Sequence, residues 1–292
     1  MSAISDKIRK EFGESDKKRD AANVIPADVE RFTNLQYARD DSCQKLDVYR
    51  PKGINGSLPV IISVHGGAWV YGDKELYQFY CMSLARHGFA VVNFTYRLAP
   101  EHKYPDCVED LNSVAAWILE NKTEYGFDCS HIFAVGDSAG AHILGVYTNI
   151  ITNHEYAGKY SFKVPDGFYL TAVGLHCGKY SFDDACTSEQ DRDIMRDVLP
   201  SGGTAEELEL INVINHITPD FAPALIMTAN CDFLKDQAPL LQQKFMKCNI
   251  PHELHVYGDK NTQVYHVFHL NMQSELAHSF NKLQCDYFKR FL

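Results

Sequence analysis

The stretch from His131 to Ile150, HIFAVGDSAGAHILGVYTNI, constrains the fold of this chain more than any other part. Its apolar run at 132–135 predicts a buried strand, and the apolar segment after residue 140 is compatible with a helix. Gly136-Asp-Ser-Ala-Gly140 stands between them, and its two glycines predict a turn too tight for side chains. A strand, a G-x-S-x-G turn and a helix form the context in which a serine is held at the apex of a turn.

Ser138 occupies that apex, so its hydroxyl is expected to point out of the sheet. The following helix would aim its unpaired N–H groups and its partial positive charge at the same place, which stabilises an anion there. The pattern alone also fits a glycine-rich turn with an idle serine, since it arises by chance in roughly one chain in ten of this length. Ser138 is predicted to be a nucleophile, and not an unreactive turn residue, only if the rest of the chain supplies a base, an acid and oxyanion donors.

Apolar and alternating runs recur along the chain and predict the other strands, with helical segments between them. The strands are expected at 44–50, 60–64, 89–96, 170–176, 224–229 and 253–257, and helices near 75–87, 106–121 and 271–290. Strands that alternate with helices imply a mainly parallel sheet with helices on both faces. We therefore predict an α/β fold with all residues, 1–292, in one domain.

Two segments, 1–40 and 178–218, are expected to form a small cap over this domain. In the first, Ile4, Ile8 and Phe12 make a thin helical stripe, although a disordered tail is the alternative. Residues 26–32 then predict a second short helix with a proline in its first turn.

The second cap segment, 178–218, breaks the alternation of strands and helices and is highly charged. It contains a predicted helix that begins at Thr204, with Glu207 three residues later at the capping-box position. We interpret this segment as an insertion over the sheet edge.

The formal net charge of −10 argues against nucleic acid and anionic membranes as partners, because both attract basic surfaces. Nine cysteines without C-x-x-C spacing indicate reduced thiols. Residues 1–20 lack the apolar core of a signal peptide, and no apolar run approaches the ~18 residues of a membrane-spanning helix. These features predict a cytoplasmic protein; a homo-oligomer is possible, but the sequence leaves the oligomeric state open.

Candidate oxyanion donors follow the predicted strand at 60–64. Gly66 and Gly67 carry no side chain that would obstruct a substrate, so their N–H groups are free to aim at a developing negative charge. With the N–H of Ala139 they would form a hole of three donors. A loop that merely needs a flexible backbone is the alternative for the glycine pair.

The acid of a triad should come from a loop after a later strand, between the serine and the histidine in chain order. Asp232 directly follows the strand at 224–229 and is the best placed. Asp236 stands one helical turn further and is expected to be structural, while Asp259 lies too near the histidine loop. The alternative for Asp232 is a simple helix cap.

The base should come last, and His266 and His269 follow the final predicted strand. Their H-x-x-H spacing also suggests a metal, but no acidic third ligand has suitable spacing, so we predict no metal and no cofactor. His252 and His255 lie in or before the strand and are poorer candidates for the base.

Five motifs, in family order, resemble the hormone-sensitive-lipase-like branch of the α/β-hydrolase esterases. They are His65-Gly-Gly-Ala-Trp69, Tyr96-Arg-Leu-Ala-Pro-Glu-His102, Gly136-Asp-Ser-Ala-Gly140, Asp232-Phe-Leu-Lys-Asp236 and His266-Val-Phe268. The resemblance implies the α/β-hydrolase fold with Ser138 as nucleophile, Asp232 as acid and His266 as base. It assigns the oxyanion hole to three backbone N–H groups, those of Gly66, Gly67 and Ala139.

Two positions depart from many members of that branch. Ala141-His142 stands where many lipase-like members have a glycine, and this resembles the small acetyl, feruloyl and formamide hydrolases of the superfamily. Gln237 closes the acid loop where glutamate is more frequent, which changes nothing catalytic. His142 is expected to be packed behind the nucleophile.

These residues predict a serine carboxylesterase that hydrolyses short-chain acyl esters, acetyl above all, of small alcohols, sugars or aromatic compounds through a covalent acyl-enzyme. The cap segments supply few long apolar stretches, which favours a small acyl group. Trp69, Tyr71 and Phe233 are the candidate substrate-binding side chains, by proximity in sequence. The alternatives are a formamide or amide hydrolase, a feruloyl-type esterase, and a non-catalytic small-molecule receptor.

Overall fold

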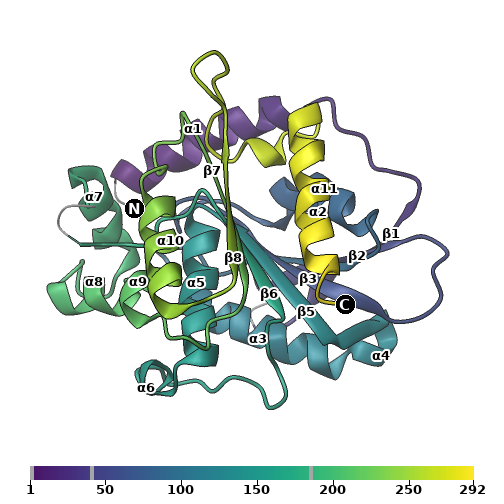
Figure 1. The fold of residues 1–292 in the computed structure, drawn as a ribbon, viewed down its shortest axis with the longest axis horizontal. Helices are drawn as coiled ribbons and strands as arrows, with labels where there is room; N and C mark the ends of the chain where they lie inside the picture. Colours follow the sequence, from purple (N-terminus) through teal and green to yellow (C-terminus); the bar gives the residue numbers. More distant parts are fainter. Residues whose placement is uncertain (1–2, 40–42, 184–186) are drawn as a thin grey trace.

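The computed structural model describes residues 3–39, 43–183 and 187–292, and its centre is a sheet of eight strands. The strands lie in the order β1-β2-β4-β3-β5-β6-β7-β8 (Figure 1). Their bounds are β1 Val29–Gln36, β2 Lys45–Pro51, β3 Leu58–Val64, β4 Ala90–Phe94, β5 Phe127–Asp137, β6 Ala172–His176, β7 Ala224–Ala229 and β8 His252–Tyr257. Strand pairs from β4 to β8 are parallel, whereas β1 and β2 are antiparallel to their neighbours.

Helices cover both faces of this sheet. The longer ones are α1 Ala3–Asp20, α2 Lys74–Ala85, α3 Asp106–Glu120, α5 Ala139–Thr152, α7 Glu189–Val198, α10 Gln237–Cys248 and α11 Glu275–Lys289. The shorter ones are α4 Lys122–Tyr125, α6 His154–Ala157, α8 Ala205–Ile211, α9 Val213–His216 and the 3₁₀ helix η2 Phe268–Leu270. Figure 1 shows α2 and α11 on the right of the sheet and α5 and α10 on the left.

The core divides in two because the central strands are buried on both faces. In β3, Val60 and Ile62 pack into the larger cluster under α3, α5 and α10, while Ile61 packs into the smaller one under α2 and α11. Alternate residues of a strand point to opposite faces, so a strand covered on both sides needs apolar residues throughout. This explains why β3 reads as a continuous apolar run.

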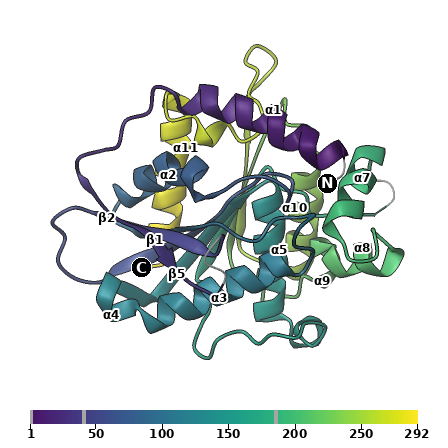
Figure 2. The same cartoon turned by 180° about the vertical axis from the view of Figure 1, so that it is seen from behind.

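The parallel strands all end at one edge of the sheet, and α1 lies across that edge (Figures 1 and 2). Its first turns contact α7, and the Ser5 hydroxyl donates to Asp197. Ile8 is buried in the larger core cluster, as the stripe of Ile4, Ile8 and Phe12 predicts for a helix lying on another surface.

The N-terminal segment differs from the prediction in one respect. Residues 26–32 do not form a second short helix; Val29–Gln36 is the edge strand β1, which pairs with β2 in antiparallel fashion. The expected helix at Thr204 is present as α8, with the Thr204–Glu207 capping box. Residues 1–2, 40 and 184–186 of the expected cap segments lie outside the described residues.

Candidate active site

The turn at Gly136–Gly140 joins the end of β5 to the start of α5. Ser138 has φ 53° and ψ −119°, a left-handed backbone conformation that a residue other than glycine rarely adopts. A Cβ atom on Gly136 would lie 2.5 Å from the Gly140 carbonyl oxygen, and one on Gly140 would lie 2.1 Å from the Val64 carbonyl oxygen. Both glycines are therefore required by close backbone approach, as the sequence predicts.

The strained serine is held by the neighbouring strand. The Ser138 N–H donates to the carbonyl of His176 at the end of β6, with an N···O distance of 2.9 Å. Its side chain remains partly exposed at the wall of a cavity, unlike the buried residues on either side. The turn therefore exposes Ser138 to the cavity, while the residues on either side of it are buried.

Asp232 and His266 form a hydrogen-bonded pair. The His266 Nδ1 atom lies 2.7 Å from Asp232 Oδ1, while Asp232 itself is buried. The carboxylate also accepts from the Leu234 N–H at 2.8 Å and from the Thr228 hydroxyl at 3.1 Å. Burial raises the pKa of Asp232, but the hydrogen bond and the charge of His266 outweigh it, so the pKa lies below its ordinary value. The acid is thus held ionised and oriented toward the histidine.

One cavity of about 200 Å³ brings the serine and this pair together. It is lined by residues of α1, of α2 and of the loops at the carboxyl ends of the strands: Phe12, Ser15, Asp16, Arg19, Gly66, Gly67, Tyr71, Leu76, Tyr77, Asp137, Ser138, Phe233, His266, Val267 and Leu270. Ser138 and His266 therefore share a wall, with Asp232 bound behind the histidine.

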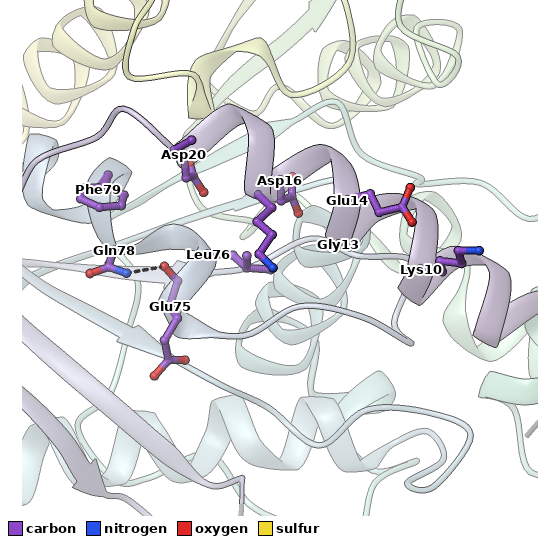
Figure 3. Close-up of a pocket in the computed structure, with 11 residues that line it drawn as sticks. Lys10, Gly13, Glu14, Asp16, Asp20, Glu75, Leu76, Gln78 and Phe79 are labelled. Carbon is purple, nitrogen blue, oxygen red and sulfur yellow. Dashed lines mark hydrogen bonds between the residues drawn. The ribbon is translucent and has the colours of Figure 1, made fainter.

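A larger hollow of about 650 Å³ lies between α1 and the first turns of α2 (Figure 3). Lys10, Glu14 and Glu75 are among its lining residues, and neither Ser138 nor His266 is. It shares Asp16 and Leu76 with the smaller cavity. Because it lacks the reactive side chains, we assign the chemistry to the smaller cavity.

Helix α1 closes one side of this candidate catalytic cavity, where a set of polar contacts holds it. The Arg19 guanidinium pairs with Asp16 and Asp20 and donates to the Leu76 carbonyl at 3.0 Å. The Tyr71 hydroxyl donates to Asp16 at 3.1 Å. These contacts fix α1 to the loop and helix that follow β3.

The oxyanion donors differ from the prediction at Gly66. Its N–H donates to the Tyr77 hydroxyl oxygen at 2.8 Å, so it is not free to stabilise a substrate oxyanion in this arrangement. Among the described residues, the N–H groups of Gly67 and of the next residue, Ala68, donate to no protein acceptor. Ala139 is the first residue of α5, where helical N–H groups have no partner within the helix.

The three aromatic residues predicted to bind substrate lie in different places. Tyr71 and Phe233 line the cavity, and the Phe233 ring lies 4.3 Å from the His266 ring with 72% of its surface exposed. Trp69 is buried and is not among the lining residues; its indole N–H donates to His142 Nδ1 at 3.1 Å. His142 in turn lies 2.9 Å from the Ile211 carbonyl, packed behind the nucleophile as expected.

A buried pair beneath the turn was not foreseen from the sequence. The Tyr77 hydroxyl donates to Asp137 Oδ2 at 2.8 Å, and burial raises the pKa of Asp137 to about 7. A Cβ atom on Gly66 would lie 2.7 Å from the same carboxylate oxygen. The aspartate inside the G-D-S-A-G motif was the only sequence signal for this pair.

His269 does not line the cavity that His266 lines. It is fully buried, and its Nε2 atom lies 3.9 Å from Asp137 Oδ1.

The one group of metal-ligating type found in the part of the chain that the structure describes is Cys177, Asp232 and His266, with ligand atoms within 4.8 Å of one another. In this group, Asp232 and His266 already form a hydrogen bond with each other. In the described ranges, no helix has the length and apolar character needed to cross a membrane.

Comparison with known proteins places this geometry in a family. The family described as alpha/beta hydrolase fold matches residues 61–270. Esterase LipC of Mycobacterium tuberculosis is 34% identical over 158 residues, which are 52% of this chain and 38% of that protein. Versiconal hemiacetal acetate esterase of Dothistroma septosporum is 37% identical over 97 residues, which are 33% of this chain and 30% of that protein. The chain thus spans less than half the length of these two relatives.

Solved structures resemble the chain over nearly its whole length. Esterase B from Lactobacillus rhamnosis, inhibited by a C4-C4 tributyrin phosphonate, has a TM-score of 0.90 and 25% identity. The match covers 99% of this chain and 95% of that one. The esterase from Pyrobaculum calidifontis has a TM-score of 0.77 and 23% identity, and so shows the shared fold. The chain therefore belongs to the α/β-hydrolase fold family, in its hormone-sensitive-lipase-like branch.

Proposed function

We propose that this protein is a serine carboxylesterase that hydrolyses short-chain acyl esters. The observation that carries the proposal is the cavity wall shared by Ser138 and His266, with the Asp232–His266 hydrogen bond of 2.7 Å behind it. A nucleophile, a base and an orienting acid in this order define the triad logic of acyl transfer. The esterase relatives support the same class of reaction.

In the proposed mechanism, His266 takes the proton of Ser138 as the serine oxygen attacks the ester carbonyl. Asp232 holds the imidazole by its Nδ1 atom and stabilises its charged form. The protonated histidine then gives its proton to the leaving alcohol, and an acyl-serine remains. Water attacks this intermediate with His266 again as base, which releases the acid and restores the serine.

The oxyanion hole of this mechanism uses the N–H groups of Gly67, which lines the cavity, and of Ala139, at the start of α5. Gly67 has φ 124°, and a Cβ there would lie 2.0 Å from the Tyr71 carbonyl oxygen, so only glycine fits that loop. Gly66, which the sequence also offered as a donor, is left out because its N–H donates to the Tyr77 hydroxyl. Removal of one such donor typically costs about 2.7–4 kcal/mol of transition-state stabilisation.

The size of the cavity supports a short acyl group. A volume of about 200 Å³ is below the ~300–1,000 Å³ of common small-molecule sites. Tyr71 and Phe233 are proposed to contact the substrate, and α1 together with 178–218 to form the cap. The acetate ester named for the Dothistroma relative and the C4 inhibitor named for esterase B are both short-chain compounds.

Rates on acetyl, butyryl and octanoyl esters of one chromogenic alcohol test the proposal. We expect kcat/KM to be highest for acetyl or butyryl and lowest for octanoyl. A maximum at octanoyl would contradict the short-chain preference. Ser138→Ala should abolish hydrolysis of all three esters while it leaves the melting temperature near that of the wild type. Persistent hydrolysis in that variant would show that Ser138 is not the nucleophile.

A further inference from the structure

Trp69 lies in the turn that carries Gly67, one of the two proposed oxyanion donors. The Gly67 carbonyl accepts from the N–H groups of Val70 and Tyr71, at 3.2 and 3.0 Å, so the chain turns tightly here. Trp69 has φ 61° within this turn, in the left-handed region, and it is buried. A strained residue keeps such a conformation only where its surroundings hold it. The geometry of the turn therefore depends on what Trp69 contacts outside it.

His142 of α5 is the polar partner of this tryptophan. The indole N–H of Trp69 donates to His142 Nδ1 at 3.1 Å, and the two rings lie nearly perpendicular, with an interplanar angle of 85°. On the other side of the imidazole, His142 Nε2 lies 2.9 Å from the carbonyl oxygen of Ile211. Both His142 and Ile211 are almost fully buried. One imidazole therefore links the loop after β3 to the end of α8.

The two partners fix the proton on this imidazole. An indole N–H can only donate and a backbone carbonyl can only accept, so Nδ1 is the acceptor and Nε2 carries the proton. Burial lowers the pKa of His142 to about 4, so the ring is uncharged at neutral pH. Both hydrogen bonds therefore form with the same neutral tautomer.

The end of α8 docks on α5 through side chains of α5. Ile211 is the last residue of α8, where a carbonyl has no partner within the helix, and His142 supplies one. Asn149, about two helical turns after His142, likewise donates its side-chain amide to the Val213 carbonyl at 2.9 Å. His142 differs from Asn149 in that it also reaches Trp69.

His142 also lies close to the second proposed oxyanion donor. Ala139 is the first residue of α5, and His142 follows it by three residues, which is about 4.5 Å along a helix axis. Gly67 precedes Trp69 by two residues in the turn. The hydrogen bond between Trp69 and His142 therefore joins the two elements that carry the donors, close to each of them.

We propose that His142 is a positioning residue of the oxyanion hole, which fixes the loop of Gly67 against α5 through its hydrogen bond with Trp69. This inference rests on the proposed esterase activity and its two donors. The N–H groups of Gly67 and Ala139 must point at one oxygen atom, so a shift of the loop against the helix weakens at least one of these hydrogen bonds. His142 does not line the cavity and touches no substrate in this scheme.

His142→Phe tests the proposal because it keeps a ring and removes both hydrogen bonds. With a short-chain ester, we expect kcat to fall about tenfold and KM to stay within about twofold of the wild type, since complete loss of a donor costs about 10²–10³ in kcat. His252→Phe is the control, because His252 also bonds a backbone carbonyl, that of Ile250 at 2.7 Å, but at the start of β8. The control should keep kcat. An unchanged kcat in folded His142→Phe, or a change in KM alone, would overturn the proposal.

A double-mutant cycle with Trp69→Phe separates positioning from simple packing. Trp69→Phe removes the indole donor and should itself lower kcat. If His142 acts through Trp69, His142→Phe should then have little further effect in the Trp69→Phe background. Equal effects of His142→Phe in both backgrounds would mean that the imidazole only fills space, and would overturn the proposal.

His142→Gln offers an acceptor and a donor on one amide group and serves if the phenylalanine variant does not fold. We expect its kcat to lie within about threefold of the wild type and above that of His142→Phe. A kcat of folded His142→Gln as low as that of His142→Phe, or about tenfold below the wild type, would contradict the proposal.

The indole N–H of Trp69 reports this hydrogen bond without any measurement of activity. The chain has two tryptophans, so Trp117→Phe leaves one indole signal in the NMR spectrum. In this background, exchange of the indole proton with deuterium should be about tenfold faster or more in His142→Phe and slow in His142→Gln. Unchanged exchange in His142→Phe would overturn the proposal. Ser138→Ala keeps the two ideas distinct, because residual hydrolysis there would refute the esterase mechanism whatever the exchange shows.

Discussion

Residues other than glycine that adopt left-handed backbone conformations gather mostly around the cavity lined by Ser138 and His266. Of the seven found among the described residues, five are Ala68, Trp69, Ser138, Cys177 and Val267. Such conformations cost about 1–3 kcal/mol each and persist only when packing and hydrogen bonds hold them. The stable sheet around the site therefore holds the backbone of these residues in strained conformations.

Gly140→Ala should damage both stability and activity. The new Cβ would lie 2.1 Å from the Val64 oxygen and 2.5 Å from the His65 oxygen, both backbone atoms that cannot rotate away. We expect the free energy of unfolding to fall by about 3 kcal/mol or more, since overpacking typically costs 1–3 kcal/mol. Chemical denaturation measures it. Gly13→Ala is the control, because its Cβ meets only the Tyr71 ring at 3.8 Å.

Asp137 makes stability depend on pH. Burial raises its pKa to about 7, from an ordinary 3.8. Between these values the folded protein keeps a proton that the unfolded chain has lost, so the free energy of unfolding falls as the pH rises. In Asp137→Asn this decline should be smaller over about pH 4 to 7, as measured by urea denaturation. The exposed Asp166→Asn is the control, and an equal decline in the wild type and Asp137→Asn would contradict the prediction.

At the scale of residues, the sequence could predict which side chains meet at the ends of parallel strands, because this depends on their order along the chain. Ser138, Asp232 and His266 each follow a strand, and parallel strands bring their ends together. It could not predict the direction of the Gly66 N–H, which depends on Tyr77 from α2. Nor could it show that Trp69, only two residues from the cavity-lining Gly67 and Tyr71, turns instead to His142.

At the scale of elements, α1 forms one wall of the cavity and is held by polar contacts along its length. Arg9 donates to the Val70 and Ala99 carbonyls, at 2.8 and 3.0 Å, and pairs with Glu101. Phe12 and Arg19 on the same helix line the cavity. The position of this helix therefore sets the shape of one side of the site.

Arg9→Ala should loosen α1 and affect substrate binding more than chemistry. We expect KM for a short-chain ester to rise about threefold or more with kcat nearly unchanged, the signature of lost uniform binding. Steady-state kinetics measures both. Lys7→Ala on the same helix is the control, because Lys7 reaches only Glu11, at 4.0 Å, and is exposed. A rise in KM of equal size in the control would contradict this role for Arg9.

The helices and strands of the α/β core could be predicted because their apolar patterns reflect burial against the sheet. Strand β1 could not, since its residues are mostly exposed or half-buried and it is stabilised by pairing with β2. Edge strands of this kind carry little apolar signal. Strand β1 therefore forms because it pairs with β2, and its own pattern of residues does not predict it.

At the scale of the whole molecule, two core clusters hold the fold, and no disulfide joins the residues that the structure describes. The eight cysteines that lie in the described ranges are all free. Addition of a reductant should therefore leave the melting temperature unchanged within about 1 °C, against shifts of ~2 °C or more per kcal/mol for a chain of this size. Differential scanning calorimetry with and without dithiothreitol checks this, and a lower melting temperature in reductant would reveal a structural disulfide.

Residues of α1 between 12 and 19 line the same cavity as Ser138 and His266, with Asp232 hydrogen-bonded behind His266. A ribosome therefore makes α1 long before it makes the loops that carry Asp232 and His266. Helix α1 also leaves the exit tunnel before α7, which its first turns contact in the folded protein. Until α7 has been made, α1 lacks part of the surface that it packs against in the folded protein.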